Sequence, residues 1–463
     1  MSEPQEQNLS VSRNLKIGLF HLGSGMADVV STGIWNRIMI SDLGFSATPI
    51  GLLVSLRYFL APLGVWAGRI SDRRAVGGYR RLFWIWLGRA MMVISMVMLG
   101  LLTAHIARGN DATPVTWLLI TLSLLLFSLG NAFSGSTFLA LIYDRAPTHQ
   151  RGRAVGIVWT FLLLGFTVGG ILFGILLPSS EGEAGAHVLG FSPDTLQNLF
   201  VIGALVMGGL WLFSVLGEER RYSQTDTKAG EIESTSLKDD LKLAWSSRRT
   251  RFFFWYLALS MIFAFSQDLI LEPFAGDVFG MDARITTRFA AYWGSMSILG
   301  TIVFLLLSRR FKRLTNTTMS YIGVAVLLAT FALFALSAFA GIRGLVTPGL
   351  ILLGIGLGIW NVGTLGMMME MSPFGRAGTF LGFWTLVVTL SRGIGVSGGG
   401  MARDLSLSLT ADFATSYGLV FALGAVGLGL ALWTLSRVNV KDVQVENGVE
   451  ETSAEKVLAA AMD

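Results

Sequence analysis

The sequence predicts an all-α polytopic membrane protein with twelve transmembrane helices, and both its composition and its long apolar runs support this prediction. Its 463 residues are 52% hydrophobic and 14% charged, whereas a soluble domain carries about 25% charged residues. Runs such as TWLLITLSLLLFSLG and GLVFALGAVGLGLALWTL are long and apolar enough to enter a bilayer. The chain has no cysteine, which excludes disulfides and thiolate chemistry.

The twelve spans follow from the requirement for about 20 mostly apolar residues in each. The first apolar segment is too long for a cleaved signal peptide and lacks a cleavage site, so we expect it to remain as a helix. The fourth is overlong, so we expect it to tilt or to extend beyond the membrane. The predicted spans are residues 15–40, 48–70, 82–105, 114–143, 153–178, 196–217, 251–275, 285–308, 317–341, 346–371, 377–400 and 413–435.

Basic residues predict the orientation of these spans. Most of the 35 Lys and Arg fall in the two tails, in the polar segment 218–250 and in alternate loops. Because basic loops stay in the cytoplasm, both termini are expected there. The predicted units are a cytoplasmic tail (1–14), a six-helix bundle (15–217), a cytoplasmic linker (218–250), a second six-helix bundle (251–435) and a cytoplasmic tail (436–463).

The two halves carry a weak internal repeat. Gly152-Arg153-Ala154 after the fourth span matches Gly375-Arg376-Ala377 after the tenth, and Asp28 in the first span falls opposite Asp268 in the seventh. Both members of each pair hold the same ordinal place and face the same way, as parallel repeats require. Two such pseudo-symmetric halves predict the major-facilitator fold, in which the binding site lies between them.

The loop after the second span, GRISDRRAVGGYRR, resembles the signature of major facilitators at this place. That likeness implies a conformational gate made of charge pairs and helix-end contacts. The alternative is that the charges only keep the loop in the cytoplasm. The corresponding loop after the eighth span, SRRFKRLTNTT, lacks the acidic residue, so any such gating should rest on the first half. The residues assigned to this gate loop are Gly68, Asp72, Arg73, Arg80 and Arg81.

Polar residues in the first span predict one wall of a central cavity. At 100° per residue, one helical stripe holds His21, Gly25, Asp28, Thr32 and Trp35. Intramembrane ionisable groups generally face the bundle interior or a cavity. Arg37 lies about 180° from Asp28, so we expect it to snorkel at the outer boundary, toward Asp42.

The seventh span repeats this pattern. Asp268 and Glu272 are four residues apart and share a face, with Gln267 adjacent and Pro273 expected to free a backbone carbonyl or to kink the helix. These acids, together with Asn131 and Asn361 of the fourth and tenth spans, are assigned to the central cavity. The alternative is that such groups only bond neighbouring helices. The available basic partners are Arg57, Arg89 and Arg392.

His21 is the one histidine placed inside a span. A lone intramembrane imidazole commonly forms an interhelical hydrogen bond. The alternative is an axial ligand to a magnesium tetrapyrrole, because a neutral imidazole nitrogen can serve as one. No other cluster of metal-ligand type is visible, so we predict no metal site beyond this option.

Two segments, GLFHLGSGMADVVSTGIWNRIMISDLG and FAFSQDLILEPFAGDVFGM, resemble the PucC/LhaA family of phototrophic bacteria. The resemblance extends over essentially all twelve spans. It implies a role in assembling light-harvesting complexes, by handling bacteriochlorophyll or by shepherding antenna polypeptides. The implied location is the bacterial inner membrane or its photosynthetic invaginations. No ligand-binding residue is carried over, since no motif defines one.

The expected function is therefore that of a non-enzymatic membrane assembly factor. Its expected partners are the lipid bilayer, antenna polypeptides and a tetrapyrrole, with bacteriochlorophyll or a precursor as cargo and no nucleic acid. The alternative is a proton-coupled exporter of a small molecule, in which Asp28, Asp268 and Glu272 carry protons. An enzyme of pigment synthesis is disfavoured, because no nucleotide loop or catalytic cluster is visible.

Overall fold

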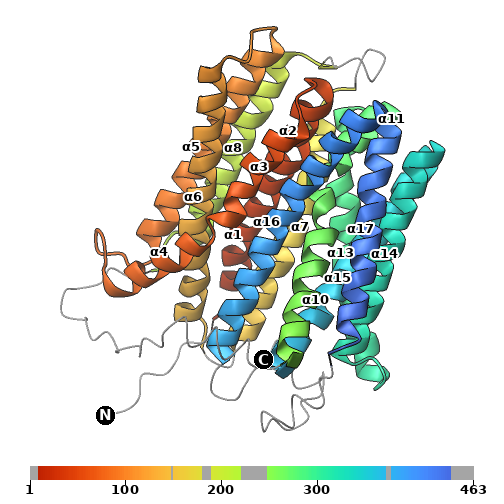
Figure 1. Cartoon of the computed structure of the whole chain (residues 1–463). Coiled ribbons are helices and arrows are strands. Elements are labelled where there is room, and N and C mark those ends of the chain that lie inside the picture. Colours follow the sequence, from red (N-terminus) through yellow and green to blue (C-terminus); the bar gives the residue numbers. More distant parts are fainter. Residues whose placement is uncertain (1–8, 148–149, 180–188, 220–247, 372–376, 439–463) are drawn as a thin grey trace, which may run out of the picture.

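The computed structural model describes residues 9–147, 150–179, 189–219, 248–371 and 377–438, and their regular structure is helical apart from one isolated bridge (Figure 1). Every predicted span coincides with a helical segment. The single-helix spans are α5 (Leu82–Ala107), α6 (Pro114–Arg145), α7 (Arg151–Leu176), α8 (Pro193–Val215), α14 (Asn316–Ala340), α15 (Val346–Met371), α16 (Ala377–Thr410) and α17 (Phe413–Leu435).

The first span departs from a regular α-helix near its middle. α1 (Val11–Asp28) passes into a π-helical stretch (Val29–Ile34), then α2 (Trp35–Arg37) and a second π-helical stretch (Ile38–Asp42). Thr32 Oγ1 donates a 2.5 Å hydrogen bond to the carbonyl oxygen of Asp28 within the first stretch. π-Helical turns are rare and are found frequently at functional sites. Here they begin immediately after an intramembrane acid.

Two further spans are interrupted near their middle. The second consists of α3 (Ala47–Phe59) and α4 (Pro62–Arg73), and α4 begins with a proline at its first position. The seventh consists of α10 (Arg248–Ala264), a 3₁₀ turn (Ser266–Asp268) and α11 (Leu271–Phe279), with a bend of 43° between the two parts. Pro273 lies in the first turn of α11, where its missing N–H breaks no hydrogen bond of the helix. The bend in the seventh span therefore occurs just before Pro273 and not at it.

Nine of the described helices are long and apolar enough to cross a membrane, or ten when the bent seventh span is included. The eighth span passes this test as Ala283–Arg310, which joins α12 (Ala283–Thr287) and α13 (Phe289–Arg310). The protein is thus a multi-pass membrane protein, as predicted. The total of twelve spans is consistent with these helices and stays a prediction.

The helices form two bundles. In the first, α1 packs on α7 and α8, and α5 packs on α6 and α8; in the second, α14 packs on α15 and α17 (Figure 1). The bundles meet along α3 with α16 and along α7 with α13. We call the end at which α1 begins the near end, and the opposite end the far end. The interface between the bundles is where the sequence predicts the functional site.

The two bundles are joined at the far end by hydrogen bonds. The carboxylate of Asp404 in α16 accepts from the backbone N–H groups of Ala47 and Thr48, at 3.1 and 2.7 Å, where α3 begins. Arg37 donates to the carbonyl oxygen of Met281 across the interface at 2.8 Å. The N–H groups at the start of α3 and the buried guanidinium of Arg37 thus find hydrogen-bond acceptors in the other half of the molecule.

The position of Arg37 shows that one prediction was wrong and that another was right. Its side chain is only 4% exposed, so it does not snorkel to the membrane surface. It does pair with Asp42, at 2.6 Å. A Cβ atom on Gly276 of α11 would collide with the guanidinium of Arg37, so this glycine makes room for the cation.

Asp404→Ala is expected to loosen the far end, because it removes the acceptor that caps α3 across the interface. The native chain has no cysteine, so Ser397→Cys, at a buried position on α16, can report on this opening. We expect maleimide to label that cysteine several-fold faster in the Asp404→Ala background. Asp412→Ala is the matched control, since Asp412 caps α17 within its own half. Equal labelling rates in both backgrounds would contradict the role of Asp404 in closing the far end.

Candidate functional site

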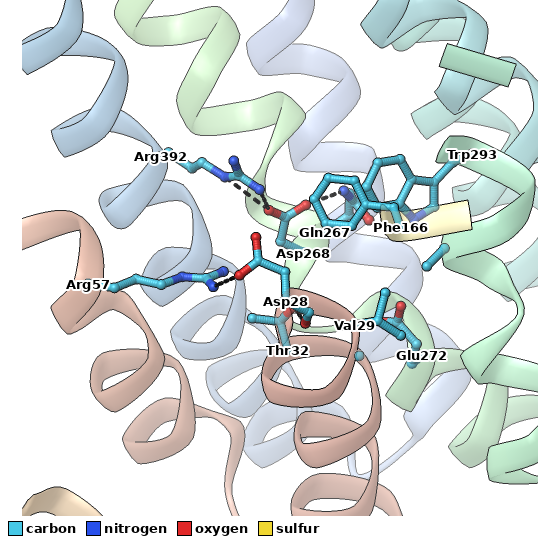
Figure 2. A pocket seen from close by; sticks show the side chains of 12 residues that line it. Asp28, Val29, Thr32, Arg57, Phe166, Gln267, Asp268, Glu272, Trp293 and Arg392 are labelled. Carbon is cyan, nitrogen blue, oxygen red and sulfur yellow. Dashed lines mark hydrogen bonds and ion pairs between the residues drawn. The ribbon is translucent and has the colours of Figure 1, made fainter. Parts of the chain in front are cut away.

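A small pocket of about 40 Å³ lies between the two bundles, within the predicted cavity region. Figure 2 shows its polar side chains converging from the first and seventh spans, with arginines from α3 and α16. Both halves contribute to its wall. The lining residues are Asp28, Val29, Thr32, Gly33, Arg57, Phe166, Gln267, Asp268, Glu272, Ala290, Trp293 and Arg392.

The first half supplies one acid–arginine pair. Arg57 Nη1 of α3 lies 2.6 Å from Asp28 Oδ1 at the end of α1. The Arg57 side chain is 7% exposed, and its Nη2 donates to the hydroxyl of Tyr58 at 2.7 Å. The guanidinium carbon also lies 4.7 Å from the centre of the Tyr58 ring. A charge at this depth is tolerated because it is paired and hydrogen-bonded.

The second half supplies a matching pair. Arg392 of α16 donates through Nη2 and Nε to Asp268 Oδ2, at 2.7 and 3.2 Å. The other oxygen of Asp268 accepts from Gln267 Nε2 at 2.6 Å. The 3₁₀ turn places Gln267 and Asp268 side by side at the break of the seventh span. Asp28 and Asp268, which the repeat suggested are equivalent, thus each pair with an arginine, but the two arginines come from the second and eleventh spans, which are not equivalent in the repeat.

The two pairs come together at Tyr58. The centre of its ring lies 4.7 Å from the guanidinium carbon of Arg57 and 5.2 Å from that of Arg392. Arg392 also lies over Phe265, at 4.3 Å. Aromatic faces attract cations, so Tyr58 connects the charged groups of the two halves.

Glu272 differs from the two paired acids. It is 7% exposed and lines the pocket from α11. Within the described residues, no lysine or arginine nitrogen lies within 4.0 Å of its carboxylate, whereas Asp28 and Asp268 both have such a partner. Its Oε1 would be 3.7 Å from a Cβ atom on Gly33, so the first and seventh spans approach closely here.

The structure places four predicted cavity residues outside the pocket lining. Trp35 is fully buried and donates to Thr103 Oγ1 of α5 at 3.0 Å. His21 stacks against Phe138 of α6, with ring centres 5.1 Å apart. The remaining two are Asn131, which is partly buried, and Asn361, which is exposed. Gly25 of the predicted stripe instead lies against the backbone of α7.

The pocket also contains apolar residues that sequence reasoning missed. Phe166 and Trp293 meet across the interface with ring centres 4.7 Å apart, and Val29 and Ala290 complete that side. No local signal distinguishes these aromatic side chains from the many others in the spans. Of the three candidate basic partners, Arg57 and Arg392 pair with the acids, and Arg89 does not.

Within the described residues, no cluster of three or more metal-ligating side chains is present. His21 is the one residue for which a metal role was considered. Its ring is packed between Phe138 and Trp159, at 5.1 and 5.9 Å. Axial ligation of a tetrapyrrole by His21 would require these rings to move.

The gate loop at the near end is centred on Arg81. Its guanidinium contacts Asp72 at 2.5 Å and Asp144 of α6 at 3.0 Å, and it donates to Ser71 Oγ at 2.6 Å. Arg80 donates to the backbone carbonyl of Asp72. The loop thereby ties α4, α5 and α6 together, all within the first half.

Other parts of this loop serve its turn or face outward. Gly77 and Gly78 have φ values of +62° and +84°, which side chains rarely adopt. Gly68 has nothing within 4 Å of a hypothetical Cβ atom, and Arg73 is exposed. The carboxylate of Glu219 caps α5 by accepting from the N–H groups of Arg81 and Leu82. Sequence reasoning missed Glu219 and Asp144, because both are far from the loop in the chain.

Arg81→Ala is expected to release α4 from its neighbours, because Asp72 and Asp144 lose their shared partner. In vesicles that expose the near end, trypsin should cleave after Arg73 and Arg74 several-fold faster than in the unaltered protein. Arg108→Ala is a suitable control, since Arg108 forms an exposed ion pair with Asp194 at the far end. Equal cleavage rates in the Arg81→Ala and unaltered proteins would show that Arg81 does not hold the loop.

Comparison with known proteins identifies a family and several relatives that this chain resembles. A family model described as "PUCC protein" matches residues 34–443. The "Bacteriochlorophyll synthase 44.5 kDa chain" of Rhodobacter capsulatus is 30% identical over 421 residues, covering 89% of this chain and 91% of the relative. "Protein PucC" of Rhodovulum sulfidophilum is 28% identical over 415 residues, covering 87% of each chain.

Solved transporter structures share the fold. A mutant of the nucleoside transporter NupG has a TM-score of 0.66 at 14% identity, with 92% of this chain and 99% of that chain covered. A bacterial homologue of the human lysosomal transporter Spinster has a TM-score of 0.64 at 16% identity, with 100% and 98% covered. The predicted major-facilitator fold is thus confirmed. At such identities the likeness extends to the fold alone.

Proposed function

Because the chain belongs to the PUCC protein family, we propose that it is a membrane assembly factor for bacterial light-harvesting complexes that binds or delivers bacteriochlorophyll. Chaperoning of antenna polypeptides is the second form that this role can take. The proposed factor is not an enzyme, resides in the photosynthetic inner membrane and has the near end of its bundle in the cytoplasm. The observation that carries the proposal is the family match over nearly the whole chain.

The interface pocket supports this role because it combines charged side chains with aromatic rings. It offers paired arginines and acids on one side and the rings of Phe166 and Trp293 on the other. A flat apolar cargo with carbonyl groups would find both stacking surfaces and hydrogen-bond donors there. Its present volume of about 40 Å³ is well below the roughly 300 Å³ of small ligand sites. Binding of a whole tetrapyrrole would therefore require the two bundles to separate.

A deletion strain tests the assembly role. The gene is removed from a phototrophic host that carries it, and near-infrared absorbance of the membranes measures antenna complexes relative to reaction centres. We expect antenna absorbance to fall at least several-fold while pigment synthesis continues, and a plasmid-borne copy to restore it. Normal antenna absorbance in the deletion strain would overturn the proposal. A general loss of pigment would instead point to synthesis.

Glu272 favours a second candidate function, a proton-coupled exporter of a small molecule. It is a buried carboxylate in the pocket without a basic partner in the described part of the chain. A carboxylate of this kind can alternate between protonated and ionised forms as the pocket opens and closes. Solute flux into inverted vesicles that depends on a proton gradient and disappears with Glu272→Gln would support this function. Flux that persists in the variant would exclude Glu272 as the proton carrier.

A further inference from the structure

A second cavity, of about 340 Å³, lies on the outer surface of the first bundle between α5 and α8. It is separate from the interface pocket and shares no lining residue with it. Ile94 and Leu212 on its rim are more than half exposed, so the groove opens toward the surrounding bilayer. Gly208 keeps the groove open, because a Cβ atom there would lie 3.0 Å from Val93 Cγ2. The groove is large enough for part of a lipid-sized molecule.

The base of this groove holds an arginine without a counter-ion. Arg89 is 5% exposed, and no carboxylate of the described residues lies within 4.0 Å of it, in contrast to Arg57 and Arg392. Its guanidinium carbon lies 4.1 Å from the Phe20 ring and 4.6 Å from the Trp211 ring. One nitrogen contacts the thioether of Met92 at 3.2 Å, and Nε has no hydrogen-bond partner.

Trp86 supplies a second unpaired donor. It lines the same groove one helical turn before Arg89, and its buried Nε1 has no hydrogen-bond partner. Such donors occur elsewhere in the described spans as well, for example Nε of Arg57 and Nε1 of Trp360, so it is their position beside a cation without a counter-ion that requires an explanation. Two of them in one apolar groove, beside an uncompensated positive charge, indicate a missing anionic acceptor.

The depth of Arg89 indicates where that acceptor comes from. Arg89 is the eighth residue of α5, so it lies roughly 10 Å along the helix from the near end, at about 1.5 Å per residue. α5 has 26 residues, hence it is roughly 39 Å long and exceeds the hydrocarbon thickness of about 30 Å by a few ångströms at each end. Arg89 therefore lies just inside the apolar layer, within reach of the headgroups of the near-end leaflet.

We propose that this groove binds an anionic phospholipid from the near-end leaflet. The phosphate accepts from Arg89 and Trp86, and one acyl chain lies along Val93, Ile94 and Gly208. A phosphate suits an arginine because it accepts charge-assisted, bidentate hydrogen bonds. The negative charge also compensates the guanidinium where water does not reach it. This inference is independent of the proposed assembly role.

Native mass spectrometry of the purified full-length protein tests the proposal, with phosphatidylglycerol and phosphatidylcholine of equal chain length as the probes. We expect the unaltered protein to retain phosphatidylglycerol selectively. Arg89→Gln should weaken this retention at least tenfold by removing the charge. Gly208→Leu should do the same by filling the groove while it keeps the arginine. Gly209→Leu is the matched control, since nothing lies within 4 Å of a Cβ atom at that neighbouring position.

Three outcomes would overturn the proposal. They are equal retention of the two lipids, undiminished retention of phosphatidylglycerol by Arg89→Gln, and recovery of a pigment from the groove in place of a lipid. Thermal unfolding of each variant without added lipid shows whether it is folded. Arg89→Gln is expected to unfold at a temperature no lower than the unaltered protein, because the uncompensated charge is gone.

Discussion

Asp28→Asn is expected to abolish antenna assembly and to destabilise the protein. The substitution leaves Arg57, which is 7% exposed, without its counter-ion. Removing one partner of a buried ion pair costs about 3–5 kcal/mol, and the lower end applies here because Asp28 is 29% exposed. The matched control is Asp194→Asn, since its ion pair with Arg108 is exposed and contributes about 0–1 kcal/mol. Thermal unfolding of the purified proteins measures the loss of stability in Asp28→Asn and in Asp194→Asn.

The double variant Asp28→Asn with Arg57→Gln separates stability from function. Removing both charges is expected to restore most of the unfolding temperature, because no unpaired ion remains. Antenna absorbance in the host should nevertheless stay low, since the pocket has lost its charged pair. Full recovery of antenna absorbance in the double variant would show that the pair only supports the fold.

Gly25→Val is expected to prevent correct folding. A Cβ atom on Gly25 would lie 2.9 Å from Gly165 Cα and from Phe166 N, and closer still to the carbonyl oxygen of Leu162. These are backbone atoms of α7, so the neighbour cannot yield by a rotamer change. Close backbone contacts through small residues hold membrane helices together, and overpacking costs about 1–3 kcal/mol or more. We expect the monodisperse yield of a fluorescent fusion to fall at least tenfold.

Gly209→Val provides the comparison for Gly25→Val. It makes the same substitution within a helix of the same bundle, but nothing lies within 4 Å of its Cβ position. Its yield in size-exclusion chromatography should remain close to that of the unaltered protein. Comparable yields of the two variants would contradict the tight contact between α1 and α7.

Sequence patterns predicted the positions of the pocket acids better than the positions of the residues that follow Asp28 in the first span. Asp28 and Asp268 both line the pocket, as the repeat suggested. The positions of Trp35 and Arg37 were projected with a constant 100° per residue, but the helix turns π-helical from Val29. A π-turn inserts an additional residue and rotates everything after it. Trp35 therefore faces Thr103, and Arg37 faces α11.

Partners across helices were predictable only in part. Helical periodicity gives the face on which Arg57, Arg89 and Arg392 lie, but not which element covers that face. Two of them meet acids, whereas the third lies against the rings of Phe20 and Trp211. Phe166 and Trp293 in the pocket resemble all other aromatic residues of the spans. Their meeting follows from the packing of α7 on α13, which no local pattern encodes.

The absorption spectrum of the protein, purified in mild detergent from a pigment-making host, tests most directly whether it handles bacteriochlorophyll. We predict a bacteriochlorophyll band that co-elutes with the unaltered protein and is at least several-fold weaker in the double variant at equal protein amount. A colourless protein from a strain that makes pigment normally would contradict the account.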